Sequence, residues 1–229
     1  MKEDGVKFTG MFVILGMLFA SCLIVSNLIA GKIWAVTDSI TVPASVILFP
    51  VTYILADIFT EVYRFERARL IIWTGFACNF LAVFAYIITI VIPYPGYWLT
   101  QEAYAVVLGM TPRFLIASFA AYLIGEFSNS MILSKLKVMT GGRKLWLRTI
   151  GSTIVGEALD SLVFILIAYA GLIQTDQIFR MILFQYILKV LFEVVFTPLT
   201  YLVVGLLKKR EGIDTFDNEV KYRLMIIRK

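Results

Sequence analysis

The chain has 229 residues, of which 60% are apolar and only 16% charged, whereas a soluble domain is about 45–50% apolar and about 25% charged. This composition identifies a membrane protein and excludes the disordered, collagenous, disulfide-rich and nucleic-acid-binding classes. The sequence contains no histidine, which excludes His-based zinc sites, Ser-His-Asp triads and His proton relays. We therefore expect neither a metal site nor a cofactor.

Six apolar segments are long enough to cross a bilayer as helices, because a span needs about 20 residues. Lipid offers no hydrogen-bond partner for an unpaired backbone group, so all six are expected to be helical. Pro50 and Pro198 lie inside two of these segments and should kink or break them. The prediction is an all-α membrane protein with one transmembrane domain over residues 1–229 and spans near 11–31, 42–63, 70–92, 113–134, 149–171 and 179–207.

The basic residues indicate how the spans are oriented. Seventeen of the 21 lysines and arginines fall in the terminal segments and the loops that share their side, and only Lys32, Arg113 and Arg180 fall on the other. Cytoplasmic loops carry such an excess, which predicts that both termini are cytoplasmic and that the protein lies in the plasma (inner) membrane. The net charge of +5 then reflects topology and requires no nucleic-acid partner. The outer loop 93–112 is expected to be an interfacial aromatic segment or a lid over a cavity.

Seven ionisable residues lie within the predicted spans or at their ends. Each costs at least about 2.5–3.5 kcal/mol at mid-bilayer, so they should face one another or water in the interior. Three pairs have helical spacing of three or four residues and so share a helix face. The seven are Asp57, Glu61, Glu126, Glu157, Asp160, Lys189 and Glu193.

The fourth and fifth predicted spans share a short pattern. Residues 125–130 are GEFSNS and residues 156–161 are GEALDS. Each segment brings a small residue, a carboxylate, an amide or acid and a hydroxyl within one and a half turns. Two antiparallel neighbours can present such faces to each other, although a match this short is also consistent with chance.

Some of these charges have structural explanations. Glu61 lies beside Arg64 near the inner end of its span, where a solvated ion pair explains it as well as a binding role does. Lys189 and Glu193 can neutralise each other as a structural pair, as readily as they can form a site. For the remaining acids the predicted spans supply too few cations, and a ligand site is favoured: Asp57, Glu126, Glu157 and Asp160.

The ligand class follows from the side chains near these acids. Carboxylates accept paired N–H bonds, and aromatic faces stack on flat rings. Such an interior suits a planar heterocycle with several N–H donors and suits an anionic phosphate poorly. The neighbouring aromatic residues are Tyr53, Trp73, Phe127, Phe164 and Tyr186.

Several segments together resemble the YhhQ-type queuosine-precursor transporters, also called the vitamin uptake transporter family. They occur in the order expected for the family over most of the chain. They match both the buried charged residues and the spacing between these residues. One departure is Arg64, where the family pattern has glycine. The segments are residues 27–32, 49–63, 117–126, 156–161 with Phe164 and Ala168, and 189–190 with 196–198.

The resemblance implies a six-helix importer without enzymatic activity or a fused ATPase. Its substrates would be 7-deazaguanine precursors of queuosine, namely 7-cyano-7-deazaguanine and also 7-aminomethyl-7-deazaguanine. Both are planar and carry adjacent N–H donors, in agreement with the ligand class above. The residues that match the family's polar positions are Asp57, Glu126, Asp160 and Lys189, with Asn27 and Glu157 also carried over.

We assign provisional roles on this basis. Glu126, Glu157 and Asp160 accept the ligand's N–H groups, Asn27 orients it and Phe164 stacks on its ring. Asp57 and Lys189 form a charge pair that changes partner during transport. A homodimer is reasonable for so short a transporter, but the sequence reveals no interface.

Three other functions remain open from the residues alone. The chain is also of the right size for the substrate-binding subunit of an ATP-driven vitamin-type uptake system. An intramembrane aspartyl protease would use paired carboxylates, but no catalytic signature accompanies them. A structural assembly partner would leave the buried acids unexplained.

Overall fold

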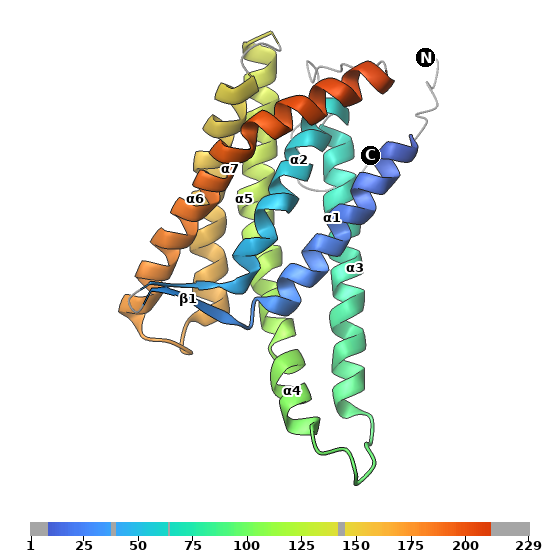
Figure 1. The fold of residues 1–229 in the computed structure, drawn as a ribbon, viewed down its shortest axis with the longest axis vertical. Coiled ribbons are helices and arrows are strands. Elements are labelled where there is room, and N and C mark those ends of the chain that lie inside the picture. The colour runs from blue at the N-terminus through green and yellow to red at the C-terminus, as the bar shows by residue number, and fades with distance from the viewer. Residues whose placement is uncertain (1–8, 38–39, 64, 142–144, 212–229) are drawn as a thin grey trace, which may run out of the picture.

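The computed structural model describes residues 9–37, 40–63, 65–141 and 145–211. Side chains at positions 126, 145–147, 149 and 211 lie outside this description. Helices dominate the fold (Figure 1). In chain order the elements are α1 (Gly10–Ile29), β1 (Ile33–Thr37), β2 (Ile40–Pro43), a 3-10 helix (Ala44–Ile47), α2 (Phe49–Tyr63), α3 (Phe65–Val91), α4 (Gln101–Gly109), α5 (Thr111–Met139), α6 (Leu145–Tyr169) and α7 (Thr175–Glu211).

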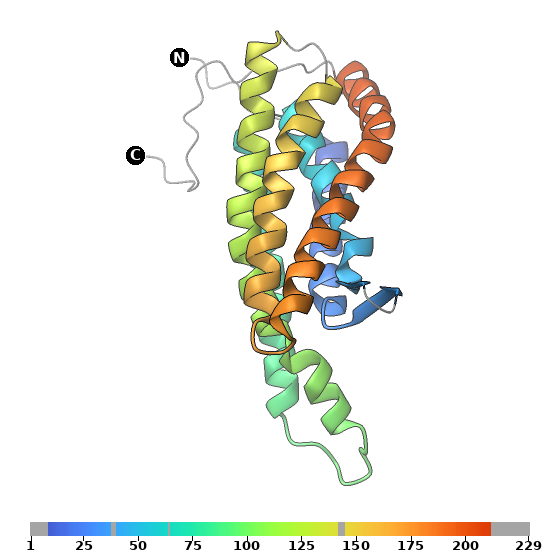
Figure 2. The same cartoon turned by 90° about the vertical axis from the view of Figure 1, so that its left-hand side faces the viewer.

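The long helices run side by side and enclose α2, while α5, α6 and α7 are consecutive antiparallel neighbours (Figures 1 and 2). Helix α2 packs against α1, α3, α5 and α7, and every residue from 55 to 63 is buried. The start of α1 and the end of α7 lie at one end of the bundle, which we call the basic end. The antiparallel β1–β2 pair lies at the other, which we call the hairpin end (Figure 1).

The protein is an all-α membrane protein. Five helical segments are long and apolar enough to cross a bilayer: α1, α3, α4 with α5, α6 and α7. Helix α2 is shorter, at 15 residues, but lies between the others as a sixth membrane element. Large apolar side chains point outward, including Met17, Phe80 and Leu81, each about two-thirds exposed. Such a surface suits lipid contact and would be unfavourable in water.

The second predicted span, 42–63, is only partly helical. Its first residues complete β2 and the 3-10 helix, and the α-helix begins at Phe49. Pro50 is therefore in the first turn of α2, where its missing N–H leaves no bond unmade. The break expected in this span therefore lies before Pro50, between the 3-10 helix and α2. Pro198 lies inside α7, which continues past it.

The segment 93–112, predicted to be an outer loop, contains a helix that the sequence did not predict. Helix α4 and the last turns of α3 extend beyond the hairpin end (Figures 1 and 2). Tyr104 of α4 donates to Thr89 Oγ1 of α3 at 2.8 Å, and Gln101 donates to the Ile90 carbonyl at 3.0 Å. These bonds, and packing onto α3 and α5, hold α4 against the projecting end of α3 rather than across the ends of α2, α6 and α7.

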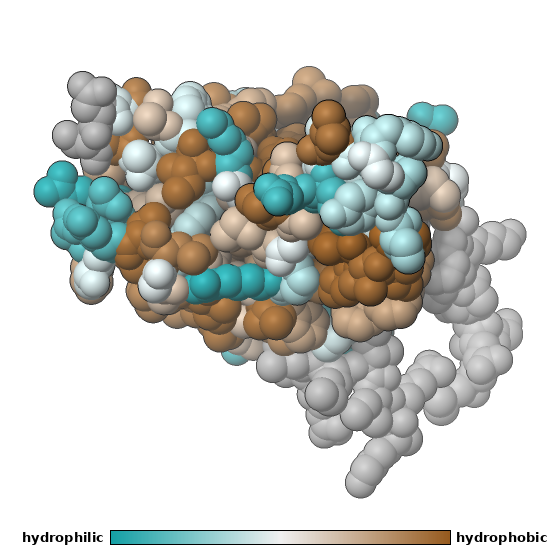
Figure 3. Space-filling model, turned by 90° about the horizontal axis from the view of Figure 1, so that it is seen from below, coloured by the Kyte–Doolittle hydropathy of each residue, from teal (hydrophilic) through white to brown (hydrophobic). Residues whose placement is uncertain are grey.

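The hairpin end is fastened by side chains that bond backbone carbonyls. Arg113 of α5 donates to Ile167 O at 2.9 Å, and the Tyr169 hydroxyl of α6 donates to Ala30 O, after α1, at 2.7 Å. Seen from this end, polar and apolar patches alternate over the surface (Figure 3). Such a mixture is typical of helix ends at a membrane–water interface.

Candidate functional site

The centre of the site is Lys189, a lysine buried within α7. Its side chain reaches α6, where Nζ lies 3.0 Å from Glu157 Oε2 and closer still to Asp160 Oδ2, to which it donates a hydrogen bond. Lys189 and Glu157 are 2% exposed, and Asp160 is 3% exposed. Because the two acids are three residues apart on α6, one ammonium group can contact both.

Two aromatic rings of α2 lie next to the same ammonium group. Lys189 Nζ is 5.1 Å from the ring centroid of Phe49 and 4.9 Å from that of Tyr53, within the range of cation–π attraction. The Phe49 ring in turn packs edge-on against Phe164 of α6, with centroids 5.9 Å apart. The sequence analysis named Tyr53 and Phe164 but missed Phe49, which lies one turn from Tyr53 on the same face of α2.

Asp57 continues this face of α2 by one further turn. Its Oδ1 accepts a hydrogen bond of 2.9 Å from Asn129 of α5. Glu193 of α7 is a further acid next to this carboxyl group. No donor among the described residues reaches Asp57 Oδ2 or Glu193 Oε1.

We call these six residues the Lys189 cluster: Asp57, Asn129, Glu157, Asp160, Lys189 and Glu193. All are at most 4% exposed. Among the described side chains the cluster combines four carboxyl groups with one cation. Hydrogen-bond acceptors are therefore in excess, as a site for a ligand rich in N–H donors requires.

A close crossing of α5 and α6 sets the positions of Asn129 and Asp160. A Cβ on Gly125 would be 2.6 Å from Asp160 Cβ, and one on Gly156 would be 2.7 Å from Asn129 Cβ. Gly125 thus packs against Asp160, which is four residues after Gly156. Gly156 packs in the same way against Asn129, which is four residues after Gly125. The matched patterns at 125–130 and 156–161 are therefore antiparallel partners in space.

Lys189 has other partners in this structure than the two that the sequence suggested. It was predicted either to neutralise Glu193 or to exchange partners with Asp57 during transport, and here it contacts the two acids of α6. The reason is the direction of its side chain, which crosses to α6 instead of following α7. Asp57 accepts a hydrogen bond from Asn129, which belongs to the 125–130 pattern but was not predicted to be a site residue.

The other proposed site residues lie in different positions. Asn27 of α1 is buried and donates to Ser118 Oγ of α5 at 3.0 Å, so it joins two helices, and its Oδ1 has no partner among the described residues. The backbone of Glu126 belongs to α5, and its side chain is outside the description. Trp73 and Phe127 pack against Phe119 and Phe65 respectively, away from Lys189.

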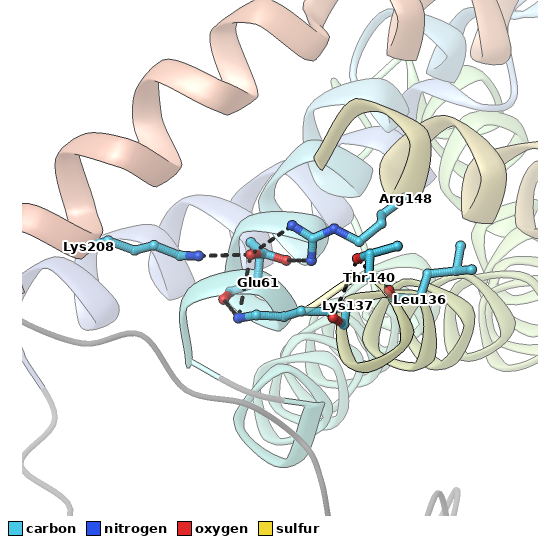
Figure 4. Close-up of polar contacts among 6 residues, drawn as sticks. All are labelled: Glu61, Leu136, Lys137, Thr140, Arg148 and Lys208. Carbon is cyan, nitrogen blue, oxygen red and sulfur yellow. Dashed lines mark hydrogen bonds and ion pairs between the residues drawn. The ribbon is translucent and has the colours of Figure 1, made fainter. Parts of the chain in front are cut away.

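Glu61 forms a separate cluster at the basic end (Figure 4). Arg148 of α6 contacts its carboxylate at 2.7 and 3.3 Å, and Lys208 of α7 does so at 2.8 Å. Lys137 of α5 lies 3.4 Å from the carboxylate and donates to the Glu61 carbonyl at 2.7 Å. We call these four residues the Glu61 cluster, and it joins the basic ends of α2, α5, α6 and α7.

Glu61 was predicted to form a solvated ion pair with Arg64, which lies outside the described residues. Glu61 itself is 2% exposed, so its carboxylate is buried rather than solvated. Lys137, Arg148 and Lys208 were assigned to loops, but α5, α6 and α7 extend far enough to contain them. Lys137 and Arg148 are consequently buried, at 3% and 1% exposed.

Comparison with known proteins gives consistent results. A family model described as "Putative vitamin uptake transporter" matches residues 43–203, more than half of the chain, from the end of β2 into α7. The "Probable queuosine precursor transporter" of Bacillus subtilis (strain 168) is 23% identical over 156 residues, which cover 68% of each chain. The "Queuosine precursor transporter" of Escherichia coli (strain K12) is 27% identical over 166 residues, covering 71% of this chain and 72% of the relative. No solved structure matches the chain.

Proposed function

Since the chain belongs to the vitamin uptake transporter family, we propose that it is a secondary transporter that imports queuosine precursors across the inner membrane. The two curated relatives are named for queuosine precursors, which supports this substrate class and favours transport over catalysis. The specific substrates proposed are 7-cyano-7-deazaguanine and 7-aminomethyl-7-deazaguanine. The observation that carries the proposal is the Lys189 cluster, an acceptor-rich, buried group inside a membrane bundle.

The proposed orientation places the basic end in the cytoplasm. Lys135, Lys137, Lys208, Lys209 and Arg210 lie at or near this end of α5 and α7, as the positive-inside rule requires. Import then carries the substrate from the hairpin end to the basic end. The Lys189 cluster lies between the two, where a transporter binds its substrate.

Binding is proposed to act by exchange of partners. The substrate's N–H groups bond Glu157 and Asp160 and displace Lys189 from them. Phe49, Tyr53 and Asp57 follow one another at four-residue intervals on α2, so the released ammonium group has an aromatic path to Asp57, whose Oδ2 has no donor among the described residues. The proposed Asp57–Lys189 pair belongs to this second state, and the opening of α6 from α7 accompanies it.

Binding of 7-cyano-7-deazaguanine to the purified protein, measured by calorimetry, tests this site. Hydrogen bonds to a charged group contribute about 1.5–3 kcal/mol. Asp160→Asn should therefore weaken binding by roughly tenfold to a hundredfold. Asp176→Asn, at an exposed acid in the first turn of α7, is the matched control and should bind as the wild type does. Equal binding by wild type and Asp160→Asn would remove Asp160 from the site.

The main competing function is a binding subunit that requires an ATP-hydrolysing partner. Both functions predict the same binding data, because both need the Lys189 cluster. They differ in whether the chain alone moves its substrate. Uptake by the purified chain in liposomes separates them.

A further inference from the structure

Gln185 is a buried polar residue of α7 that the proposed mechanism does not use. It is 1% exposed, and its amide oxygen, Oε1, has no hydrogen-bond partner among the described residues. A buried acceptor without a donor costs stability. An apolar side chain of similar length, such as Met, would fill the same space without that cost.

Helix geometry places Gln185 next to the Lys189 cluster. Gln185, Lys189 and Glu193 are spaced by four residues, so they share one face of α7. Helix α7 begins at the hairpin end, so Gln185 lies one turn, about 6 Å, from Lys189 towards that end. Because Lys189 contacts Glu157 and Asp160 on antiparallel α6, Gln185 is level with the next turn of α6, residues 161–164.

That turn of α6 carries a second buried polar group without a partner. Ser161 is completely buried, and its Oγ has no hydrogen-bond partner among the described residues. Phe164 is one turn further, against Phe49, whose ring lies beside Lys189. Two neutral polar groups therefore adjoin the charged cluster and the aromatic rings.

We propose that Gln185 and Ser161 form a neutral subsite that binds the polar edge of the substrate. This inference rests on the proposed function and adds the residues that select among substrates. Gln185 Oε1 accepts an N–H of a planar heterocycle, and the Ser161 hydroxyl bonds an adjacent polar atom of the same edge. Glu157 and Asp160, the partners of Lys189, bind the remaining N–H groups of the substrate. A substrate without that N–H leaves Gln185 unpaired and is rejected.

The test separates a binding role from a structural one by measuring two properties of Gln185→Met in detergent. The first is the affinity for 7-cyano-7-deazaguanine by calorimetry, which should fall at least tenfold. The second is the melting temperature without ligand, which should be unchanged or higher because an unpaired acceptor has been removed. Ser161→Ala should show the same two effects to a smaller extent.

Asn79→Leu is the matched control. Asn79 of α3 is also 1% exposed and also has a buried amide atom, Nδ2, without a partner among the described residues. Its replacement should leave the melting temperature unchanged or higher and should not alter the affinity. This control shows what removal of a buried, unpaired amide does outside the site.

Each remaining outcome overturns the inference. If Gln185→Met binds as tightly as the wild type, the subsite is wrong and the proposed function stands. If Gln185→Met melts at a clearly lower temperature, Gln185 supports the fold instead. If the folded wild type binds no deazaguanine, the proposed function fails and the subsite fails with it.

Discussion

Two buried groups of charged residues differ in their balance of charge. Among the described side chains, three cations surround Glu61, whereas four carboxyl groups accompany Lys189. A carboxylate whose oxygens all receive donors has nothing left to offer a ligand. The Glu61 cluster is therefore suited to holding helices together, and the Lys189 cluster to binding.

Glu61→Gln tests this difference in stability. Removal of one partner from a buried ion pair is strongly destabilising, so we expect the free energy of unfolding to fall by about 3–5 kcal/mol. Denaturation in mixed detergent micelles measures it. Glu66→Gln, at an exposed acid of α3, is the control and should change the free energy of unfolding by less than about 0.5 kcal/mol. Similar effects of the two substitutions would show that the Glu61 cluster contributes little.

Residue pairing was the least predictable part of the site. The spacing of Glu157, Asp160 and Lys189 predicted which helix faces are polar, and the structure brings these residues together. Spacing along one helix does not reveal which neighbour a long side chain will reach. For this reason the contacts of Lys189 with Glu157 and Asp160 were not predicted, and Phe49 and Gln185 were missed.

At the scale of elements, the α5–α6 crossing controls the geometry of the cluster. The glycines at 125 and 156 let two backbones approach closely, as small residues do in membrane helices. Asn129 and Asp160 then lie directly over the opposite glycine. The crossing therefore fixes one polar residue from each helix relative to α2 and α7.

Gly125→Ala should separate α5 from α6, because its Cβ would be 2.7 Å from the Gly156 carbonyl oxygen and 2.6 Å from Asp160 Cβ. Overpacking of this kind costs about 1–3 kcal/mol. We expect a lower melting temperature together with weaker binding of 7-cyano-7-deazaguanine. Gly205→Ala on α7 is the control, since its Cβ meets no atom within 4 Å. If the two variants melted alike, the close crossing would not be important.

Hydropathy predicted most of the membrane helices but not the irregular elements. The predicted ends of the first span, 11–31, differ from those of α1 by only one or two residues. The β1–β2 pair and α4 were missed because each is too short to be detected by a hydropathy pattern of about 20 residues. The boundary of α2 depends on the turn before Pro50, which periodicity cannot resolve.

At the scale of the whole molecule, the bundle places an acceptor-rich interior between a basic end and a hairpin end. The Glu61 cluster joins four helices at the basic end, while Arg113 and Tyr169 fasten the hairpin end. The proposed transport cycle requires the connections at the two ends to loosen in turn. This arrangement is the basis for proposing transport by the chain itself.

Uptake of 7-cyano-7-deazaguanine into liposomes that contain only the purified chain tests the central claim most directly. The account predicts saturable uptake without ATP or another protein, reduced at least tenfold by Asp160→Asn and unchanged by Asp176→Asn. Uptake that occurs only after an ATP-hydrolysing partner is added would contradict it.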